Sequence, residues 1–362
     1  MDRFAACFSG VEDPRTGNAQ RHDLLEVLFM SLCASLCGAE SCVDMADFAE
    51  AKEDVLRGFL KLEGGAPSHD TFSRVFRLLD PQAFEAAFMG FVRRFADKIE
   101  GVVAIDGKAL KGAYARGARH APLHLVNVWA AEARMVVAQR LAPGRNEVAG
   151  MLEALALLDL EDCIVTADAL HCRKDVAAAI RKRGGDYALA VKRNQPHLYA
   201  EVKRRLMAGP ADSIVTDVEE GHDRSEVRRA RIVPAAELEQ SHGFADVRAV
   251  ASVEAVRQSA NGNETVHTRY YILSTCLNAE RLAAVVRAHW GIENNLHWML
   301  DVAMGEDAAR NRVGHGPQNL SLLRKLALNI IKANDDKGSI KGKIKRAGWD
   351  DAFLTKLFAH MR

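Results

Sequence analysis

Three acidic side chains stand where the sequence could assemble a site for phosphoryl transfer. Asp106 follows the apolar run 102–105, Asp168 follows a second such run over 163–167, and Glu293 lies in a helical stretch. Carboxylate oxygens are hard ligands that suit Mg²⁺ or Mn²⁺, and two ions about 4 Å apart can activate an attacking oxygen and stabilise a leaving one. The three acids together therefore predict a two-metal site.

Asp106 alone is better explained as a turn cap, because Asp-Gly pairs are common in turns. Lys108 and Lys111 follow it and would bring positive charge to an anionic substrate. We expect Gly107 to turn the chain sharply, so that both lysines face the substrate and not the metal. Asp168 favours the metal site, since two carboxylates side by side repel each other unless a cation lies between them.

Glu293 belongs to a predicted helix over residues 278–300, in which His289, Glu293 and His297 recur every four residues beside Trp290 and Trp298. This stack could be a metal or catalytic set, but tryptophan and histidine also pack well at domain contacts, and the pattern leaves both interpretations open. Glu293 is preferred as the third acid because its helix fixes its direction. Three nearby acids compete with it: Asp301, Glu306 and Asp307.

The elements around these acids follow the order of a mixed α/β core. Strands are predicted over 102–106, 123–131, 135–141, 163–168 and 187–191, with helices over 146–157 and 174–183. A crossover that returns the fourth strand beside the first would place Asp106 and Asp168 side by side.

The remaining segments surround this core. Residues 1 to about 98 are predicted to be helical, and the helix over 69–78 suits either a phosphate-contacting helix-turn-helix unit or an ordinary amphipathic helix. Residues 197–278 predict a helix and four strands that insert into or extend the sheet, with a hairpin turn at 258–263. Residues 337–346 are expected to form a flexible basic loop before a terminal helix.

Composition excludes several classes of protein. The 362 residues are 48% hydrophobic and 27% charged, which is typical of a globular chain of two or three units. The most apolar helical run is too short to span a bilayer, so we expect a cytoplasmic protein without a membrane partner. The seven cysteines form no CxxC pair, and a GxxxxGKS phosphate loop is absent from the sequence.

Several short motifs occur in an order that is more specific than any one of them. They include Pro67-Ser-His-Asp-Thr-Phe-Ser-Arg-Val-Phe76, Ala104-Ile-Asp-Gly-Lys108, Ile164-Val-Thr-Ala-Asp-Ala-Leu-His171, Asn194-Gln-Pro196 and His289-Trp-Gly-Ile-Glu-Asn294. Over nearly the whole chain this set resembles bacterial insertion-sequence transposases of the ISAs type, including the H-repeat-associated proteins.

The resemblance implies a ribonuclease H-like mixed sheet core with a β insertion, preceded by an all-helical N-terminal domain. It implies a DDE triad of Asp106, Asp168 and Glu293 that binds two Mg²⁺ or Mn²⁺ ions, cleaves double-stranded DNA at element ends and joins it to target DNA. Joining two ends needs two active sites, so a homo-oligomer on DNA is expected. Five segments are expected. They are a helical head (1–98), the first part of the core (99–197), a β insertion (198–278), the glutamate-bearing part of the core (279–334), and a basic loop with a terminal helix (335–362).

Helper residues of the related IS-four group do not transfer, because Val286, His289 and Leu300 stand where that group has tyrosine, arginine and lysine. His289 is expected to replace the arginine as a phosphate contact. Asn194 and Gln195 are equally explained by a turn before Pro196. The full set expected to contact DNA is Lys108, Lys111, Arg145, Lys192, Arg193, Asn194, Gln195, His289 and Arg310.

Two other functions fit the same sequence. One is a transposase remnant that binds DNA without cutting it, and the other is a nuclease on the ribonuclease H fold that does not transfer strands. The presence of all three acids argues against the remnant, while the long helical head and the β insertion favour a protein that holds specific DNA ends.

Overall fold

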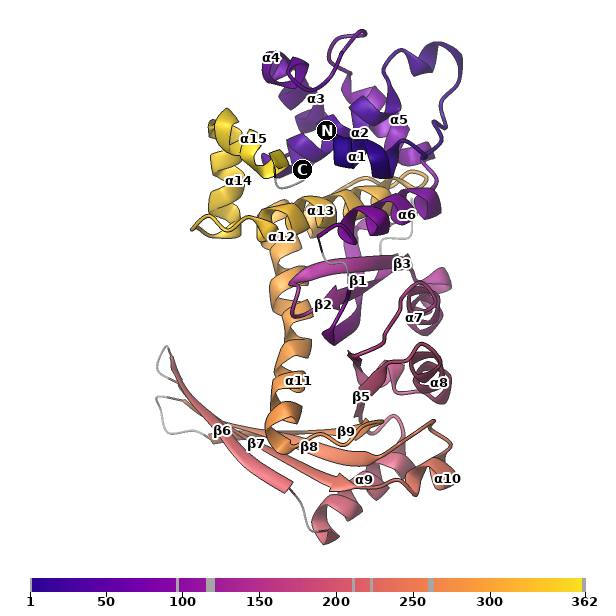
Figure 1. Ribbon diagram of the computed structural model, residues 1–362, viewed down its shortest axis with the longest axis vertical. Coiled ribbons are helices and arrows are strands. Elements are labelled where there is room, and N and C mark those ends of the chain that lie inside the picture. The colour runs from indigo at the N-terminus through magenta and orange to yellow at the C-terminus, as the bar shows by residue number, and fades with distance from the viewer. Residues whose placement is uncertain are drawn as a thin grey trace.

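The computed structural model describes residues 2–95, 98–114, 121–209, 212–221, 224–259 and 264–359. The molecule is elongated, with a helical head at one end, a sheet with flanking helices in the middle and a curved run of strands at the other end (Figure 1). Part of the predicted hairpin turn, residues 260–263, lies outside the described residues.

The head is helical as predicted, and local capping explains where several of its helices begin. Asp23 accepts a hydrogen bond from the Glu26 N–H, and Ser41 and Asp44 form a capping box. The helices of the head are α1 (Asp2–Phe8), a 3₁₀ turn (Gly17–Gln20), α2 (Leu24–Leu36), α3 (Cys42–Ala51), α4 (Glu53–Arg57), α5 (His69–Leu78) and α6 (Pro81–Val92).

The middle layer contains the predicted meander and crossover. The elements are β1 (Gly101–Tyr114), β2 (Pro122–Ala130), β3 (Met135–Leu141), a 3₁₀ turn (Pro143–Arg145), α7 (Glu147–Leu155), β4 (Cys163–Ala167), a 3₁₀ turn (Ala169–His171), α8 (Lys174–Lys182) and β5 (Asp186–Val191). Strand β1 pairs antiparallel with β2 and parallel with β4, and β4 pairs parallel with β5. This mixed sheet is the expected ribonuclease H-like core.

The strands after β5 extend the same sheet. They are β6 (Asp212–Gly221), β7 (Arg224–Pro234), β8 (Ala249–Ser259) and β9 (Glu264–Leu273), with α9 (Pro196–Ala208) and α10 (Leu238–His242) between them. Because β9 pairs antiparallel with β5, the described residues form one nine-stranded sheet in the order β3-β2-β1-β4-β5-β9-β8-β7-β6. The β unit therefore continues the core sheet.

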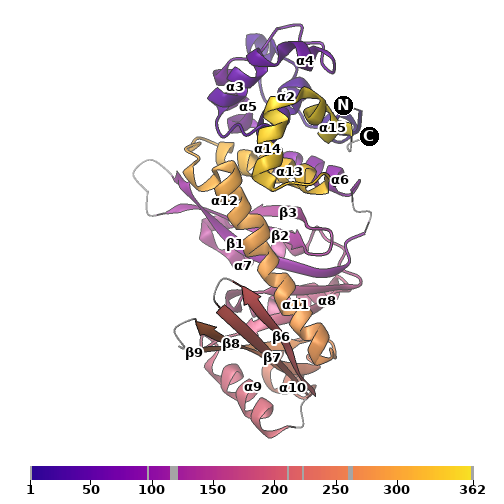
Figure 2. The same ribbon diagram turned by 90° about the vertical axis from the view of Figure 1, so that its left-hand side faces the viewer.

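A long helical rod then runs back across the sheet from the curved strands to the head (Figure 2). It comprises α11 (Ala279–Gly291), a π-helical turn (Ile292–His297) and α12 (Trp298–Met304), followed by a 3₁₀ turn (Glu306–Ala308). Helix α13 (Gly316–Ala333) packs against both the head and β3. Among the described residues, every helix is too short or too polar to cross a membrane.

The expected flexible basic loop at 337–346 is wrong over most of its length. Residues Ile340–Trp349 form α14, which Ser339 caps, and α15 (Asp351–Ala359) follows. Lys341, Lys343 and Lys345 lie on this short helix, and the Lys343 ammonium donates a hydrogen bond to the Asn334 carbonyl. The glycines and charges of this segment do not predict a helix, but burial of Ile344 and Ala347 stabilises one.

Candidate active site

Strand register brings the two aspartates to neighbouring positions. The last parallel pair between β1 and β4 joins Ile105 to Ala167. Asp106 follows Ile105, and Asp168 follows Ala167. The crossover through α7 therefore returns β4 beside β1, as predicted. The prediction that β1 ends at Asp106 is wrong, because β1 continues to Tyr114 and pairs Asp106 with Asn127 of β2.

Asp106 is a partly buried acid whose pKa is affected by the charges of three other acids. One of its oxygens accepts the Gly107 N–H at 2.9 Å, and the other lies 3.6 Å from Nδ1 of His297. Burial raises the pKa of Asp106 to about 7; the Gly107 N–H opposes this shift, and the charges of Asp168, Glu293 and Glu147 add to it. A cation at this position would relieve both the burial cost and the repulsion.

Glu293 faces the site from a π-helical turn, not from the continuous α-helix that the sequence predicts. Two histidines on either side of it dock this rod onto the sheet. His289 Nδ1 lies 2.9 Å from Thr166 Oγ1 on β4, and His297 Nε2 lies 3.2 Å from Asn127 Nδ2 on β2. Turns of this kind are frequent at functional sites, because they shift the direction of the side chains that follow.

The two histidines act as packing and hydrogen-bonding groups in this structure. Burial lowers the pKa of His289 to about 4 and that of His297 to about 3, so both rings are neutral at physiological pH. Neither histidine is placed with Glu293 as a metal set. His289 does line the same cavity as Glu293 and so stays within reach of a substrate there.

A cavity of about 260 Å³ opens beside Asp168 and Glu293. Lys192 and Arg193, at the end of β5, line it together with Arg269 of β9. Both oxygens of Asp168 lie within 3.1–3.2 Å of the Lys192 ammonium. Two acids and three cations thus share one concave surface, which suits a phosphate group next to a carboxylate site.

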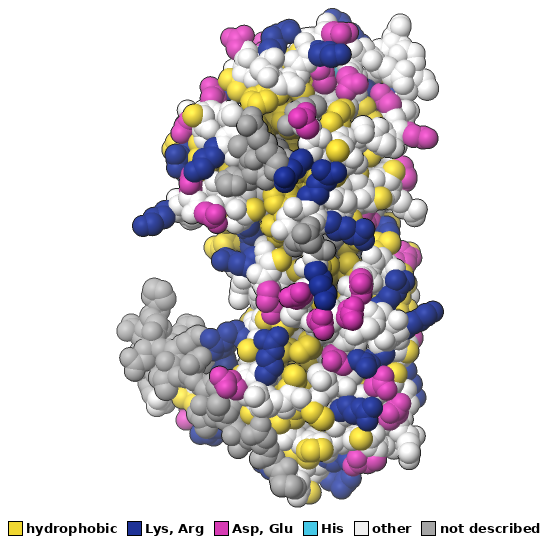
Figure 3. All heavy atoms as spheres, in the orientation of Figure 1, with side chains coloured by type: hydrophobic (Ala, Val, Ile, Leu, Met, Phe, Trp, Pro, Cys, Tyr) yellow, Lys and Arg dark blue, Asp and Glu magenta, His cyan; other side chains and the backbone are white. Residues whose placement is uncertain are grey.

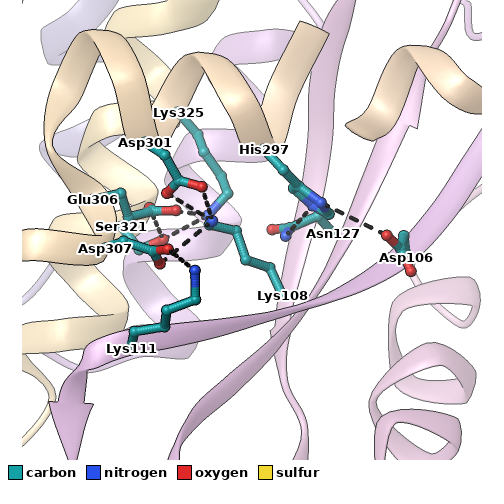
Figure 4. Close-up of polar contacts among 10 residues, drawn as sticks. All are labelled: Asp106, Lys108, Lys111, Asn127, His297, Asp301, Glu306, Asp307, Ser321 and Lys325. Carbon is teal, nitrogen blue, oxygen red and sulfur yellow. Dashed lines mark hydrogen bonds and ion pairs between the residues drawn. The ribbon is translucent and has the colours of Figure 1, made fainter. Parts of the chain in front are cut away.

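The two lysines after Gly107 do not share the exposed position that the sequence predicts. Lys108 is buried, and its ammonium lies 2.7 and 2.8 Å from the two oxygens of Asp301 (Figure 4). Lys111 is exposed and lies 2.6 Å from Asp307. Because Lys108 already has an internal partner, we do not retain it among the residues proposed to contact DNA.

The acids that competed with Glu293 belong to this lysine cluster. Asp301 and Asp307 bind Lys108 and Lys111, while Glu306 accepts a hydrogen bond from Ser321 at 2.6 Å. In Figure 4 all three lie on the opposite side of Lys108 from Asp106. Their position favours Glu293 as the third acid.

The other residues expected to contact DNA fall into two groups. Asn194 donates to the Ala169 carbonyl at 2.9 Å, and Gln195 donates to the Cys172 carbonyl, so both amides hold the loop that follows Asp168. Arg145, before α7, and Arg310, before α13, are exposed. Neither arginine lines the cavity beside Asp168.

Sequence reasoning missed the role of Gly107 and of Glu147. A Cβ atom at position 107 would lie 2.4 Å from the Glu147 carboxyl, so glycine here permits a close approach and does not form a turn. His124 Nδ1 lies 2.9 Å from Glu147, and His171 Nε2 lies 4.0 Å from it. In the sequence Glu147 lies only within the predicted helix over 146–157, and its two histidine neighbours have no common spacing that could reveal the contact.

Comparison with known proteins identifies the family. Residues 97–330 match the model described as the transposase DDE domain, and residues 5–92 match the one described as DDE_Tnp_1-associated. The chain belongs to the DDE transposases. The insertion-sequence family expected from the order of the motifs is thereby confirmed.

Several curated relatives of this DDE transposase are similar over most of their length. "Putative transposase YncI" of Escherichia coli O157:H7 is 32% identical, with 97% of this chain and 93% of that protein covered. "H repeat-associated putative transposase YhhI" of E. coli K12 is also 32% identical, with 93% of each covered. The piggyBac transposase synaptic complex with hairpin DNA aligns with 98% of this chain and 77% of that one, at 11% identity and a TM-score of 0.45, a likeness too distant to carry an argument.

DDE transposases use divalent metal ions, and the donor set of this chain fits one. Asp106, Asp168 and Glu293 offer carboxylate oxygens, the ligands that Mg²⁺ and Mn²⁺ prefer. Burial raises the pKa of Asp106, and the charges of Asp168 and Glu293 add to that shift. Among the described side chains, no three of the acids, histidines and cysteines converge closely enough to hold an ion. The Lys192 ammonium contacts the Asp168 carboxylate instead.

Proposed function

We propose that this transposase cleaves DNA strands at the ends of its own element and joins the freed 3′-hydroxyl to target DNA. The observation that supports this most is the register of β1 and β4, which places Asp106 beside Asp168, with Glu293 acting on the same charge cluster. These three carboxylates would hold Mg²⁺ or Mn²⁺. A divalent ion there would supply an activated water and neutralise charge on the phosphate.

The chain's own cations would position the phosphodiester. Lys192, Arg193 and Arg269 line the cavity beside Asp168 and would neutralise the phosphates on either side of the scissile bond. His289 would add a neutral hydrogen-bonding contact, and exposed Lys111, Arg145 and Arg310 would contact the flanking duplex. Joining two ends requires two such sites, so we propose that two or more copies assemble on DNA.

Cleavage is tested with purified protein and a labelled duplex that carries the inverted repeats bracketing its own gene. We expect strand cleavage at the repeat boundary in Mg²⁺ or Mn²⁺, and loss of at least a thousandfold in Glu293→Gln. Glu280→Gln is the matched control, because Glu280 is an exposed glutamate in the first turn of the same rod. EDTA should abolish cleavage by the wild-type protein.

Other outcomes would favour the alternative functions. Repeat-specific binding with no cleavage in either metal would indicate a remnant. Degradation that ignores the repeats and yields no joined product would indicate a nuclease. Equal cleavage by Glu293→Gln and the wild-type protein would remove Glu293 from the site.

A further inference from the structure

A second, larger cavity adjoins the one that holds Asp168 and Glu293. It has a volume of about 640 Å³ and lies between α11 and the neighbouring face of β7, β8 and β9. Arg269, Val286 and Trp290 line both cavities, so the two lie side by side along α11. A polymer held at the acids could therefore extend along α11 without leaving the surface of the protein.

Strand register explains why this face of the sheet is basic. Val253, Ala255 and Arg257 alternate along β8 and so lie on one face, with Arg228 of β7 and His267 of β9 both opposite Ala255. Nearer the core the same face is apolar, and Val253 packs in one cluster with Val285 and Val286 of α11. Toward the strand ends the face thus changes from a packing surface to a charged one.

Among the described residues that line this cavity, positive charge predominates. Arg228, Arg257, Arg269 and Arg287 line it, and Glu132 is the only acid among the described lining residues. Glu132 is already engaged, because its carboxylate accepts the Val102 N–H at 2.7 Å. Arg229, the next residue of β7, lies on the opposite face and pairs with Glu254 at 3.2 Å.

An aromatic side chain sits at the junction of the two cavities. The Arg269 guanidinium lies 4.2 Å from the centre of the Trp290 ring, and both residues line both cavities. Guanidinium groups bind phosphates through paired hydrogen bonds, and tryptophan offers a flat surface to sugars and bases. Basic side chains also border the hollow beside the curved strands in the space-filling view (Figure 3).

We propose that this groove binds the sugar–phosphate backbone of the DNA strand that leaves the catalytic cavity, with Arg228, Arg257 and Arg287 as phosphate contacts. The inference rests on the proposed function, since it takes DNA as the substrate. It adds a defined track for that substrate along α11. The groove would hold the strand in register while the acids act on one phosphate.

The test compares two charge-matched double variants. Arg257→Gln/Arg287→Gln removes two exposed arginines that line the groove, whereas Arg204→Gln/Arg229→Gln removes two exposed arginines that do not line it. Binding of a fluorescein-labelled DNA duplex is followed by anisotropy over a series of KCl concentrations in EDTA, so that cleavage cannot interfere. Thermal unfolding by circular dichroism verifies that each variant folds.

The groove variant should show a salt-dependence slope about 2 units shallower than wild type and bind DNA roughly ten- to a hundredfold more weakly near 0.1 M salt, since each lost phosphate contact removes about 0.9 from the slope. The control variant should bind like wild type. If the groove variant fails to fold, Arg257→Lys/Arg287→Lys keeps the charge and should retain the wild-type slope.

Three results would overturn the inference. An unchanged slope in a folded groove variant, with wild-type cleavage intact, would refute the groove alone and leave the proposed function standing. Tighter binding of an RNA duplex of the same sequence would reject DNA as the occupant. A wild-type protein that binds no DNA at all would remove the proposed function together with the groove.

Discussion

Replacing Lys108 by methionine separates an internal role of this lysine from a role in DNA binding. The side chain is 7% exposed, and its ammonium lies 2.7 Å from Asp301, which is 30% exposed. Removing one partner of a buried ion pair costs about 3–5 kcal/mol, and the partial exposure of Asp301 reduces this to about 2–3 kcal/mol. We therefore expect Lys108→Met to lower the free energy of unfolding by that amount.

Urea unfolding followed by far-UV circular dichroism measures this loss, and DNA anisotropy measures the salt dependence of binding. Lys108→Met should leave the salt slope unchanged. The double variant Lys108→Met/Asp301→Leu should recover to within about 1 kcal/mol of wild type, since replacing both partners of a buried pair by apolar groups is often neutral.

Lys111→Met is the matched control, because the Lys111 side chain is 76% exposed. It should cost less than about 1 kcal/mol of stability. If Lys111 contacts DNA, its loss should lower the salt slope by about 0.9. A Lys108→Met protein as stable as wild type, with a slope lower by about one contact, would refute the structural assignment and restore Lys108 to the DNA-binding set.

Three further outcomes follow from contacts elsewhere. Gly112→Ala should lower the free energy of unfolding by about 3 kcal/mol, because the new Cβ meets the Ala309 carbonyl oxygen at 2.1 Å. Gly107→Ala should lower it by only about 1 kcal/mol, because its new Cβ meets a side-chain carboxyl. Equal losses in urea titrations would contradict this. Asp13→Ala should lower the free energy of unfolding by about 2–4 kcal/mol in the same assay, since it removes the carboxylate that pairs with the fully buried Arg15 guanidinium. A loss below about 1 kcal/mol would show that the hydrogen bond to the His22 carbonyl is enough to stabilise the buried guanidinium. Burial raises the pKa of Glu85 to about 7 from 4.5, so its contribution to stability is complete below pH 4.5 and is lost as the pH rises through 7. Glu85→Gln should therefore flatten the fall in thermal midpoint between pH 5 and 8, and an identical fall in both proteins would disprove the shift.

The arrangement of the aspartates could be predicted because it depends on local and topological rules. The apolar runs before Asp106 and Asp168 identify buried strands, and the right-handed crossover limits where the second strand can lie. The partner of Lys108 could not be predicted in this way. Asp301 is 193 residues farther along the chain, and nothing in its spacing distinguishes it from the other acids nearby.

Two other differences have local causes. The sequence around Glu293 has helical periodicity on both sides, so a π-helical turn of six residues leaves no recognisable pattern. Gly107 suggested a sharp turn because glycine often permits one. In the structure it lies within a strand and makes room for Glu147, a contact that depends on how α7 packs against the sheet.

Helix α13 determines whether the helical head and the core can be separated into independent proteins. Residues Asn319 to Ile331 are all buried, and the Asn319 amide donates to the Phe76 and Leu79 carbonyls of the head, while the Asn329 amide donates to the Val136 carbonyl of β3. Such a helix must be enclosed by partners, so neither half can be expressed alone without uncovering it. Exchange of heads between related proteins would therefore require α13 to be exchanged with them, and the boundary between the two matched regions is not a site at which the chain can be divided.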